Sequence, residues 1–164
     1  MPAQVVILLG APGSGKGTQA ARLAPAIRFA HVATGDLFRE NVKGGTPLGQ
    51  KVKGFMDSGK LVPDELVLDM LFDRLSRPDC SKGVILDGFP RTLPQAEALK
   101  ARLGAQVPHV VHIRVRDELI LQRASGRVLC KACGHVQNTH SAPPKVAGKC
   151  DRCSGELARR PDDE

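Results

Sequence analysis

The sequence contains no tryptophan and no tyrosine, and phenylalanine accounts for only five of its 164 residues. Proteins that bind single-stranded nucleic acid usually stack its bases on aromatic side chains, so this composition argues against that class of site. No apolar run approaches the roughly 18 residues that a membrane span requires. The first residues, MPAQVVILLGAPG, have no basic region before their apolar run and no cleavage site. We therefore expect no signal peptide and a cytoplasmic protein.

The net charge of +7 points to anionic partners. Charge alone does not choose among nucleic acid, a membrane surface and phosphorylated metabolites. Because aromatic residues are few and long apolar runs are absent, we expect small phosphorylated ligands, with neither nucleic acid nor membrane as a partner. The length fits a single domain with a small insert.

The stretch GAPGSGKGTQ has most of the features of a phosphate-binding loop. The common pattern is G-x-x-x-x-G-K-[ST], and Gly10, Gly15 and Lys16 match its spacing. The residue after the lysine is Gly17 instead of a hydroxyl residue, and the hydroxyl comes one position later at Thr18. The pattern is therefore close to the common one but departs from it at one defined position.

The segments on either side of this loop support phosphate binding. The apolar run at 4–9 predicts a buried strand, and the residues at 16–27 predict a helix. This order places backbone N–H groups and the positive end of a helix dipole around an anion. Gly13 and Gly15 allow close approach of the backbone, and Lys16 supplies charge to the β and γ oxygens. A plain strand-to-helix turn is the alternative, but such a turn does not need the lysine.

The remaining sequence repeats this alternation of strand and helix. Buried strands are predicted at 29–34, 83–88 and 109–115, and helices at 64–76 and 92–104. Asp64 follows a proline and is expected to cap its helix. Strands separated by helices predict an α/β fold with a parallel, doubly wound sheet and ligands at the carboxyl ends of its strands.

Asp87 closes the predicted strand at 83–88 after three apolar residues. P-loop enzymes keep at this position the acid that holds Mg²⁺ or its waters. An aspartate at the end of a strand is also a common turn former, so its position alone does not decide between the two. The sequence GFPRT, which follows directly at 88–92, strengthens the magnesium interpretation.

Four of the five cysteines form the pattern C-x2-C-x16-C-x2-C, at Cys130, Cys133, Cys150 and Cys153. This spacing is typical of a structural zinc site, in which four thiolates leave no open coordination position. Two disulfides are the alternative, although a chain without a secretory signal usually keeps its thiols reduced. His135 or His140 could replace one ligand. Cys80 stands apart and is expected to be a structural thiol.

Together these motifs resemble the adenylate kinase family, in its bacterial form with a long zinc-binding lid. The matching segments are GAPGSGKGTQ (10–19), ATGDLFRENV (33–42), GKLVPDE (59–65), LDGFPRT (86–92) with Gln95, QRASGR (122–127) and RRPDD (159–163). Members of this family usually have glycine after the loop lysine, which accounts for Gly17. The resemblance implies a P-loop nucleoside monophosphate kinase fold with a zinc-ribbon lid insert. Its implied divisions are a core at 1–125, an AMP-binding segment at 33–62 and a lid at 126–163.

The resemblance implies that a monomer transfers the γ-phosphoryl group of ATP to AMP by direct in-line displacement and forms two ADP. The arginines, Lys16 and Mg²⁺ would position the reacting groups and neutralise their charge. Mg²⁺ would be held by ATP, by waters and by Asp87 through water, without direct ligation by Thr18. Closure of the lid and the AMP-binding segment would exclude water from the reaction.

The resemblance also assigns roles to individual residues. The catalytic charges would be Lys16, Arg91, Arg123, Arg127 and Arg160. The residues that contact ATP would be Gly13, Ser14, Gly15, Lys16, Gly17, Thr18, Arg123, Arg127 and, mainly through the backbone, Val136 and Gln137. The residues that contact AMP would be Thr34, Arg39, Lys60, Leu61, Val62, Gly88, Phe89, Pro90, Arg91, Gln95 and Arg160.

Some of these roles carry a specific chemistry. Gln95 would hydrogen-bond adenine, and Arg39 and Arg91 would bind the AMP phosphate, because a planar guanidinium suits a phosphate better than an ammonium does. Arg123 and Arg127 lie four positions apart and would project from one face if their segment is helical. The residues at 119–121 would then pack that helix on the core.

Two other functions remain open. A pyrimidine nucleoside monophosphate kinase shares the fold and the loop and differs at the acceptor base, where Thr34 and Gln95 favour adenine. A basic zinc-ribbon protein could bind nucleic acid, although the positive charge here is dispersed.

Relatives of this kind continue past the point where this sequence stops. We therefore expect the last strand and helix of the core to be absent, with apolar surface exposed at one sheet edge. Weak or no kinase activity is expected as a result.

Overall fold

The computed structural model describes residues 2–58, 60, 62–106 and 108–159. The chain forms two compact units, the first from Met1–Gly10 and Gly15–Ile113 and the second from Ala11–Ser14 and Arg114–Glu164. The division at 113 and 114 differs from the predicted boundary at 126, and the functional domain boundaries stay a prediction. Across the described part of the chain, no helix has the length and apolar character needed to cross a membrane.

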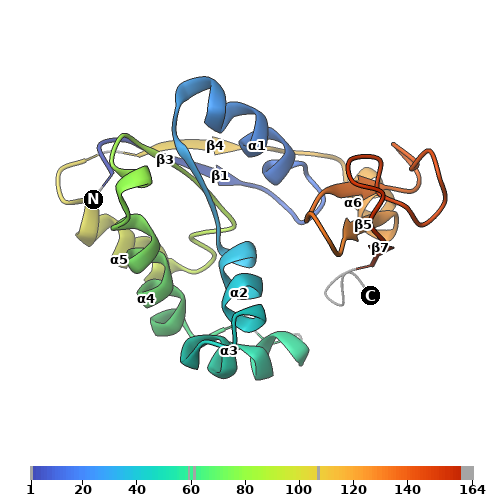
Figure 1. The fold of residues 1–164 in the computed structure, drawn as a ribbon. Helices are drawn as coiled ribbons and strands as arrows, with labels where there is room; N and C mark the ends of the chain where they lie inside the picture. The colour runs from blue at the N-terminus through green and yellow to red at the C-terminus, as the bar shows by residue number, and fades with distance from the viewer. Residues whose placement is uncertain (1, 59, 61, 107, 160–164) are drawn as a thin grey trace. The chain divides into compact units, whose positions relative to one another are not determined.

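The first unit is built on a parallel sheet. Within the described residues it has four strands, β1 (Val5–Leu9), β2 (Ala30–Ala33), β3 (Val84–Asp87) and β4 (His109–His112), in the order β2-β3-β1-β4 (Figure 1). Asp87 lies opposite both Leu8 and Ala33 in the strand register. The carboxyl ends of β1, β2 and β3 therefore lie side by side at the same end of the sheet. This arrangement confirms the predicted parallel α/β sheet.

Strand β4 forms where it was predicted, but the prediction that it is buried was wrong. Its side chains are exposed, with 56% of Val110 and 48% of Val111 accessible to solvent. Among the described residues β4 is an edge strand that pairs with β1 on one side only, and its valines are packed in neither of the two apolar cores of this unit. An apolar sequence therefore predicted the strand correctly and its burial incorrectly.

Helices cover both faces of this sheet, because alternate strand residues point to opposite faces. Helix α1 (Lys16–Ile27) packs Ala20 and Ala24 against Leu8 and Ile85 on one face. Helices α4 (Asp64–Leu75) and α5 (Leu93–Leu103) lie on the other face, side by side (Figure 1). The second face holds the larger apolar core, which includes Leu71.

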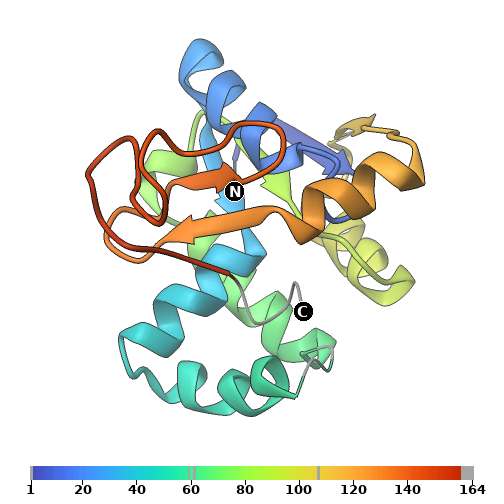
Figure 2. The same ribbon diagram turned by 90° about the vertical axis from the view of Figure 1, so that its right-hand side faces the viewer.

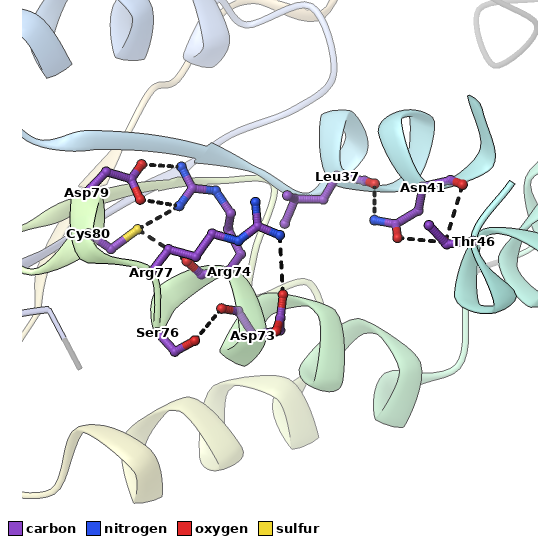
Figure 3. A network of polar contacts seen from close by, with 9 residues as sticks. All are labelled: Leu37, Asn41, Thr46, Asp73, Arg74, Ser76, Arg77, Asp79 and Cys80. Atoms are coloured by element: carbon purple, nitrogen blue, oxygen red, sulfur yellow. Dashed lines mark hydrogen bonds and ion pairs between the residues drawn. The ribbon is translucent and has the colours of Figure 1, made fainter. Parts of the chain in front are cut away.

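Helices α2 (Thr34–Lys43) and α3 (Pro47–Asp57) lie within the predicted AMP-binding segment. Thr46 joins them, because its hydroxyl donates to the side chain of Asn41 at 2.8 Å and accepts from the backbone N–H of Gly49 at 2.9 Å. Asn41 in turn donates to the carbonyl of Leu37 (Figure 3). The two helices are thus held in a fixed hairpin directly after β2.

A polar cluster at the end of α4 holds the short helix η1 (Pro78–Cys80) in place (Figure 3). Arg74 donates to both carboxylate oxygens of Asp79, at 2.9 and 2.6 Å, and to the sulfur of Cys80 at 3.0 Å. The Arg74 guanidinium lowers the pKa of Asp79, so this pair stabilises the fold at neutral pH and weakens as pH falls through that lowered pKa. Cys80 is fully buried, and burial raises the pKa of its thiol, which fits a structural role.

The second unit contains helix α6 (Asp117–Ser125) and, among the described residues, three antiparallel strands. Strand β5 (Arg127–Cys130) lies between β6 (Val136–Asn138) and β7 (Leu157–Ala158), and Figure 2 shows β5 beside β6. Because α6 ends at Ser125 and Arg127 already belongs to β5, Arg123 and Arg127 do not share a helix face. The predicted apolar face at 119–121 was also wrong, since no residue of α6 is buried and Leu121 is 71% exposed.

Candidate active site

Part of the glycine loop belongs to the first unit and leads from β1 into α1. Gly10 and Gly15 have φ values of 145° and 100°, a region that favours glycine. Lys16 is the first residue of α1, and its ammonium donates to the carbonyl of Gly10 at 2.8 Å. The lysine charge is thus held at the N-terminus of a helix, where backbone N–H groups and the helix dipole also favour an anion.

The position after the lysine is restricted by Asp87. A Cβ atom placed on Gly17 would lie 3.1 Å from Oδ2 of Asp87, which is closer than most side chains tolerate. The carboxylate at the end of β3 therefore approaches the first turn of α1 with no side chain between them. Nε2 of His31 lies 3.6 Å from the same oxygen. The close approach of Asp87 to position 17 gives a physical reason for the glycine that distinguishes this loop from the common pattern.

The remaining loop residues, Ala11–Ser14, belong to the second unit and contact α6. Arg123 donates through Nη1 to the carbonyls of Gly13 and Ser14, at 3.4 Å each. A Cβ atom on Gly13 would lie 3.3 Å from the carbonyl of Ile120, so glycine allows this close approach. Arg123 therefore supports the loop backbone, and its guanidinium lies beside residues predicted to bind phosphate.

A second group of predicted residues surrounds the carbonyl of Gly88. Thr34, which begins α2 and is 3% exposed, donates its hydroxyl to this carbonyl at 3.0 Å. Arg91 donates to the same oxygen through Nε at 2.9 Å. The structure thus brings Thr34 to Gly88 and Arg91, although Thr34 and Gly88 are 54 positions apart in the chain.

Gln95 is joined to this group by hydrogen bonds from both ends of its side-chain amide. Its Oε1 accepts from the backbone N–H of Arg91 at 2.8 Å, and its Nε2 donates to Oδ1 of Asp64 at 2.6 Å. Thr92 donates to the other oxygen of Asp64 at 3.0 Å and also accepts from the backbone N–H of Gln95. Gln95 is 4% exposed and is firmly held.

The prediction that Asp64 caps its helix was wrong. Pro63 occupies the N-cap position and no side-chain cap is formed, while the carboxylate of Asp64 reaches across to Thr92 and Gln95. Sequence reasoning missed this contact because an acid at the start of a helix is normally explained by the helix itself.

The other predicted AMP contacts are more dispersed. Arg39 forms an ion pair with Asp36 one turn earlier in α2. Val62 packs against the larger core, whereas Lys60 is exposed. Phe89 is almost fully buried and Pro90 partly so. Leu61 and Arg160 lie outside the described residues, so their predicted roles have no structural description.

The four predicted metal ligands cluster in the second unit. Their sulfur atoms all lie within 4.8 Å of one another, with 3.4 Å between Cys130 and Cys153 and 3.7 Å between Cys133 and Cys150. Tetrahedral zinc with Zn–S bonds of about 2.3 Å separates its ligands by about 3.8 Å, whereas a disulfide joins its sulfurs at about 2.05 Å. All five cysteines are described, and none forms a disulfide. The arrangement fits a four-thiolate metal site.

The surroundings of the cluster also fit a bound cation. The backbone N–H of Cys133 donates to the sulfur of Cys130 and lowers the pKa of that thiol to about 6, which favours the thiolate that a metal requires. The N–H of Gly155 lowers the pKa of Cys153, but the neighbouring cysteine sulfurs raise it more, to about 12. A Cβ atom on Gly155 would lie 2.9 Å from the Cys130 sulfur, so this position has no room for a side chain.

The two predicted lid contacts differ in environment. Val136 is 43% exposed, whereas Gln137 is buried and exchanges two hydrogen bonds with Asp151, at 2.9 and 3.0 Å. Asp151 lies between Cys150 and Cys153, so this pair ties the second cysteine turn to β6. Sequence reasoning missed Asp151, because nothing in the local pattern pairs an acid inside C-x2-C with a distant glutamine.

A parallel sheet whose first strand leads through a glycine loop and a lysine into a helix defines a P-loop nucleotide-binding protein. The profile of the family described as "Adenylate kinase" matches residues 8–163. The adenylate kinase of Lachnoclostridium phytofermentans is 51% identical over 162 residues, covering 97% of this chain and 75% of that protein. The chain therefore belongs to the adenylate kinase family.

Other bacterial relatives agree with this placement. The adenylate kinase of Desulforudis audaxviator is 52% identical over 161 residues, and that of Caldicellulosiruptor bescii is 52% identical over 162 residues. These matches cover 96% and 97% of this chain and 75% of each relative. The predicted family and fold class are confirmed, and the expectation of weak or no kinase activity stays a prediction.

Proposed function

We propose that the chain carries out the reaction ATP + AMP ⇌ 2 ADP with the predicted loop, arginine and acceptor residues in the roles given above. The observation that carries this proposal is Lys16 at the start of α1, with the Asp87 carboxylate beside the same helical turn. A positive charge and a carboxylate at one helix N-terminus suit a nucleotide triphosphate and its metal ion.

The donor nucleotide binds through the glycine loop in this proposal. Backbone N–H groups and Lys16 hold its phosphate oxygens, and Arg123 and Arg127 add positive charge for the phosphoryl group in transfer. Asp87 would hold Mg²⁺ through water, and the ion would supply positive charge to the phosphate oxygens. The absence of a side chain at Gly17 keeps the Asp87 carboxylate accessible from α1.

The acceptor nucleotide binds at the group formed by Thr34, Gly88, Arg91 and Gln95. Arg91 is exposed, and its guanidinium donates through Nε to the Gly88 carbonyl, so its two Nη groups can face a phosphate. Gln95 contacts the adenine base with the hydrogen-bonding capacity that its amide retains. Positioning and charge neutralisation then suffice for direct transfer, without a covalent intermediate.

The four-cysteine cluster holds a structural zinc ion in this proposal. The ligands are Cys130, Cys133, Cys150 and Cys153, which supply four thiolates and leave no open position for catalysis. The ion joins two turns that are distant in sequence and stabilises the lid. We further propose a monomer that acts in the cytoplasm, a reducing compartment that suits unbridged thiols.

The experiment that tests the proposed substrates is ADP formation from ATP with each acceptor in turn. We expect AMP to be used with a kcat/KM at least about tenfold above that of CMP or UMP, because the acceptor site presents an amide suited to adenine. Equal or greater efficiency with CMP or UMP would show that the chain is a pyrimidine nucleoside monophosphate kinase.

A further inference from the structure

Asp64 stands outside every role assigned so far, yet its carboxylate contacts the residue proposed to read the acceptor base. Both of its oxygens accept hydrogen bonds, Oδ1 from Nε2 of Gln95 at 2.6 Å and Oδ2 from the hydroxyl of Thr92 at 3.0 Å. Asp64 is the first residue of α4, and Thr92 is the N-cap of α5, so the contact joins the N-terminal ends of two helices that pack together.

These contacts leave one orientation for the Gln95 amide. A carboxylate only accepts hydrogen bonds and a backbone N–H only donates them. Nε2 of Gln95 must therefore face Asp64, and Oε1 must face the backbone N–H of Arg91. Turning the amide over would set two acceptors against each other at Asp64 and two donors at Arg91. In a buried site each unpaired group is costly.

A fixed amide distinguishes between purines. The 6-amino group of adenine donates and its N1 accepts, whereas the 6-oxo group of hypoxanthine accepts and its N1–H donates. An amide with a fixed orientation can pair its donor and acceptor with those of only one of these two bases when both bind in the same position. With the other base, donor would face donor and acceptor would face acceptor. Each amide atom of Gln95 retains capacity for a further hydrogen bond, since Nε2 has a second N–H and Oε1 a second lone pair.

We propose that Asp64 is a positioning residue that sets the acceptor-base specificity by fixing the orientation of Gln95. This inference rests on the proposed function, in which Gln95 contacts the base. This role needs no contact between Asp64 and the base or the reacting phosphates. Its effect on specificity passes through the Gln95 amide, with Thr92 holding the second carboxylate oxygen in place.

The test measures equilibrium binding of AMP and IMP by titration calorimetry, which gives a base selectivity that does not depend on turnover. We expect Asp64→Ala to lower the ratio of AMP to IMP affinity by about tenfold, because it removes the acceptor that orients Gln95. Asp64→Asn keeps one acceptor oxygen and should retain most of the selectivity. Asp69→Ala, at an exposed position on the same helix, is the matched control and should leave the ratio unchanged.

The variant Gln95→Leu separates the inference from the function on which it rests. If Gln95→Leu leaves the AMP to IMP ratio unchanged, Gln95 does not read the base and that part of the proposed function is wrong. If Gln95→Leu lowers the ratio but Asp64→Ala matches Asp69→Ala, the positioning role of Asp64 is overturned. If both variants lower the ratio of AMP to IMP affinity, the double variant should lower this ratio no further than Gln95→Leu alone. Additive losses would show that Asp64 does not act through Gln95.

Discussion

At the residue scale, the decisive position is the one that departs from the common phosphate-loop pattern. Gly17 lies in the first turn of α1, and a Cβ atom there would approach Oδ2 of Asp87 to 3.1 Å. In the proposed function that carboxylate serves the magnesium ion. The missing side chain therefore keeps a carboxylate and a helix N-terminus close together, and a residue of ordinary size would force them apart.

Gly17→Ala is expected to separate stability from activity. Alanine has a higher helix propensity than glycine, by up to about 1 kcal/mol in a helix interior, and this gain should offset the cost of the Asp87 contact, so thermal stability should stay close to that of the unaltered chain. We expect kcat to fall on the order of tenfold, because the Asp87 carboxylate must shift by a few tenths of an ångström or more. Gly54→Ala in α3 is the matched control, since its Cβ would meet nothing within 4 Å. Unchanged kcat in Gly17→Ala would remove the proposed link to Asp87.

Single residues also show where sequence reasoning stops. The glycine loop, Lys16 and the four cysteines were identified because their chemistry depends on spacing along the chain. Asp64 and Asp151 were missed, because each acts on a glutamine that only the fold brings near, across 31 positions for Gln95 and 14 for Gln137. Local patterns explain an acid at a helix start or in a turn without any partner.

At the scale of elements, the two cysteine turns carry much of the order of the second unit. Cys130 ends β5, while Cys150 and Cys153 lie on a turn whose Asp151 bonds to Gln137 in β6. The strands here are short, with two to four residues each. So small a sheet buries little apolar surface, and in the proposed function a metal held by the four cysteines would stabilise it.

Metal analysis tests this account of the second unit. We expect about one zinc ion per chain and its loss in Cys150→Ser, which removes one of four ligands and should lower the thermal stability of the lid before that of the core. Cys80→Ser is the control, since Cys80 is buried in the other unit and should leave the zinc content unchanged. Metal-free protein with two disulfides by thiol titration would show that the zinc proposal is wrong.

Elements were predicted well where apolar periodicity was strong and less well where tertiary context decides. The ranges of α1, α4 and α5 and of the four parallel strands match their predicted segments within a few residues, counting described residues only. The burial of β4 and the apolar face of α6 were not predictable, because an apolar pattern does not tell which neighbours cover it. The position of Arg127 was missed because Gly126 ends the helix one residue earlier.

At the scale of the whole molecule, the phosphate loop divides between two compact units. Gly15 and Lys16 belong to the unit with the parallel sheet, and Gly13 and Ser14 to the unit with α6 and the cysteines. The acceptor group around Gly88 lies wholly within the first unit. The loop thus crosses the boundary between the two units along the chain.

The most direct test of the central claim is AMP-dependent ADP formation by the chain and by its Lys16→Met variant. We expect ADP formation from ATP to require AMP, and Lys16→Met to lower kcat on the order of 10²- to 10³-fold with the fold intact, because the lysine charge matters most in the transition state. Lys82→Met, at an exposed position, should leave kcat unchanged. ADP formation that does not depend on AMP, or equal rates in the unaltered chain and Lys16→Met, would contradict the account.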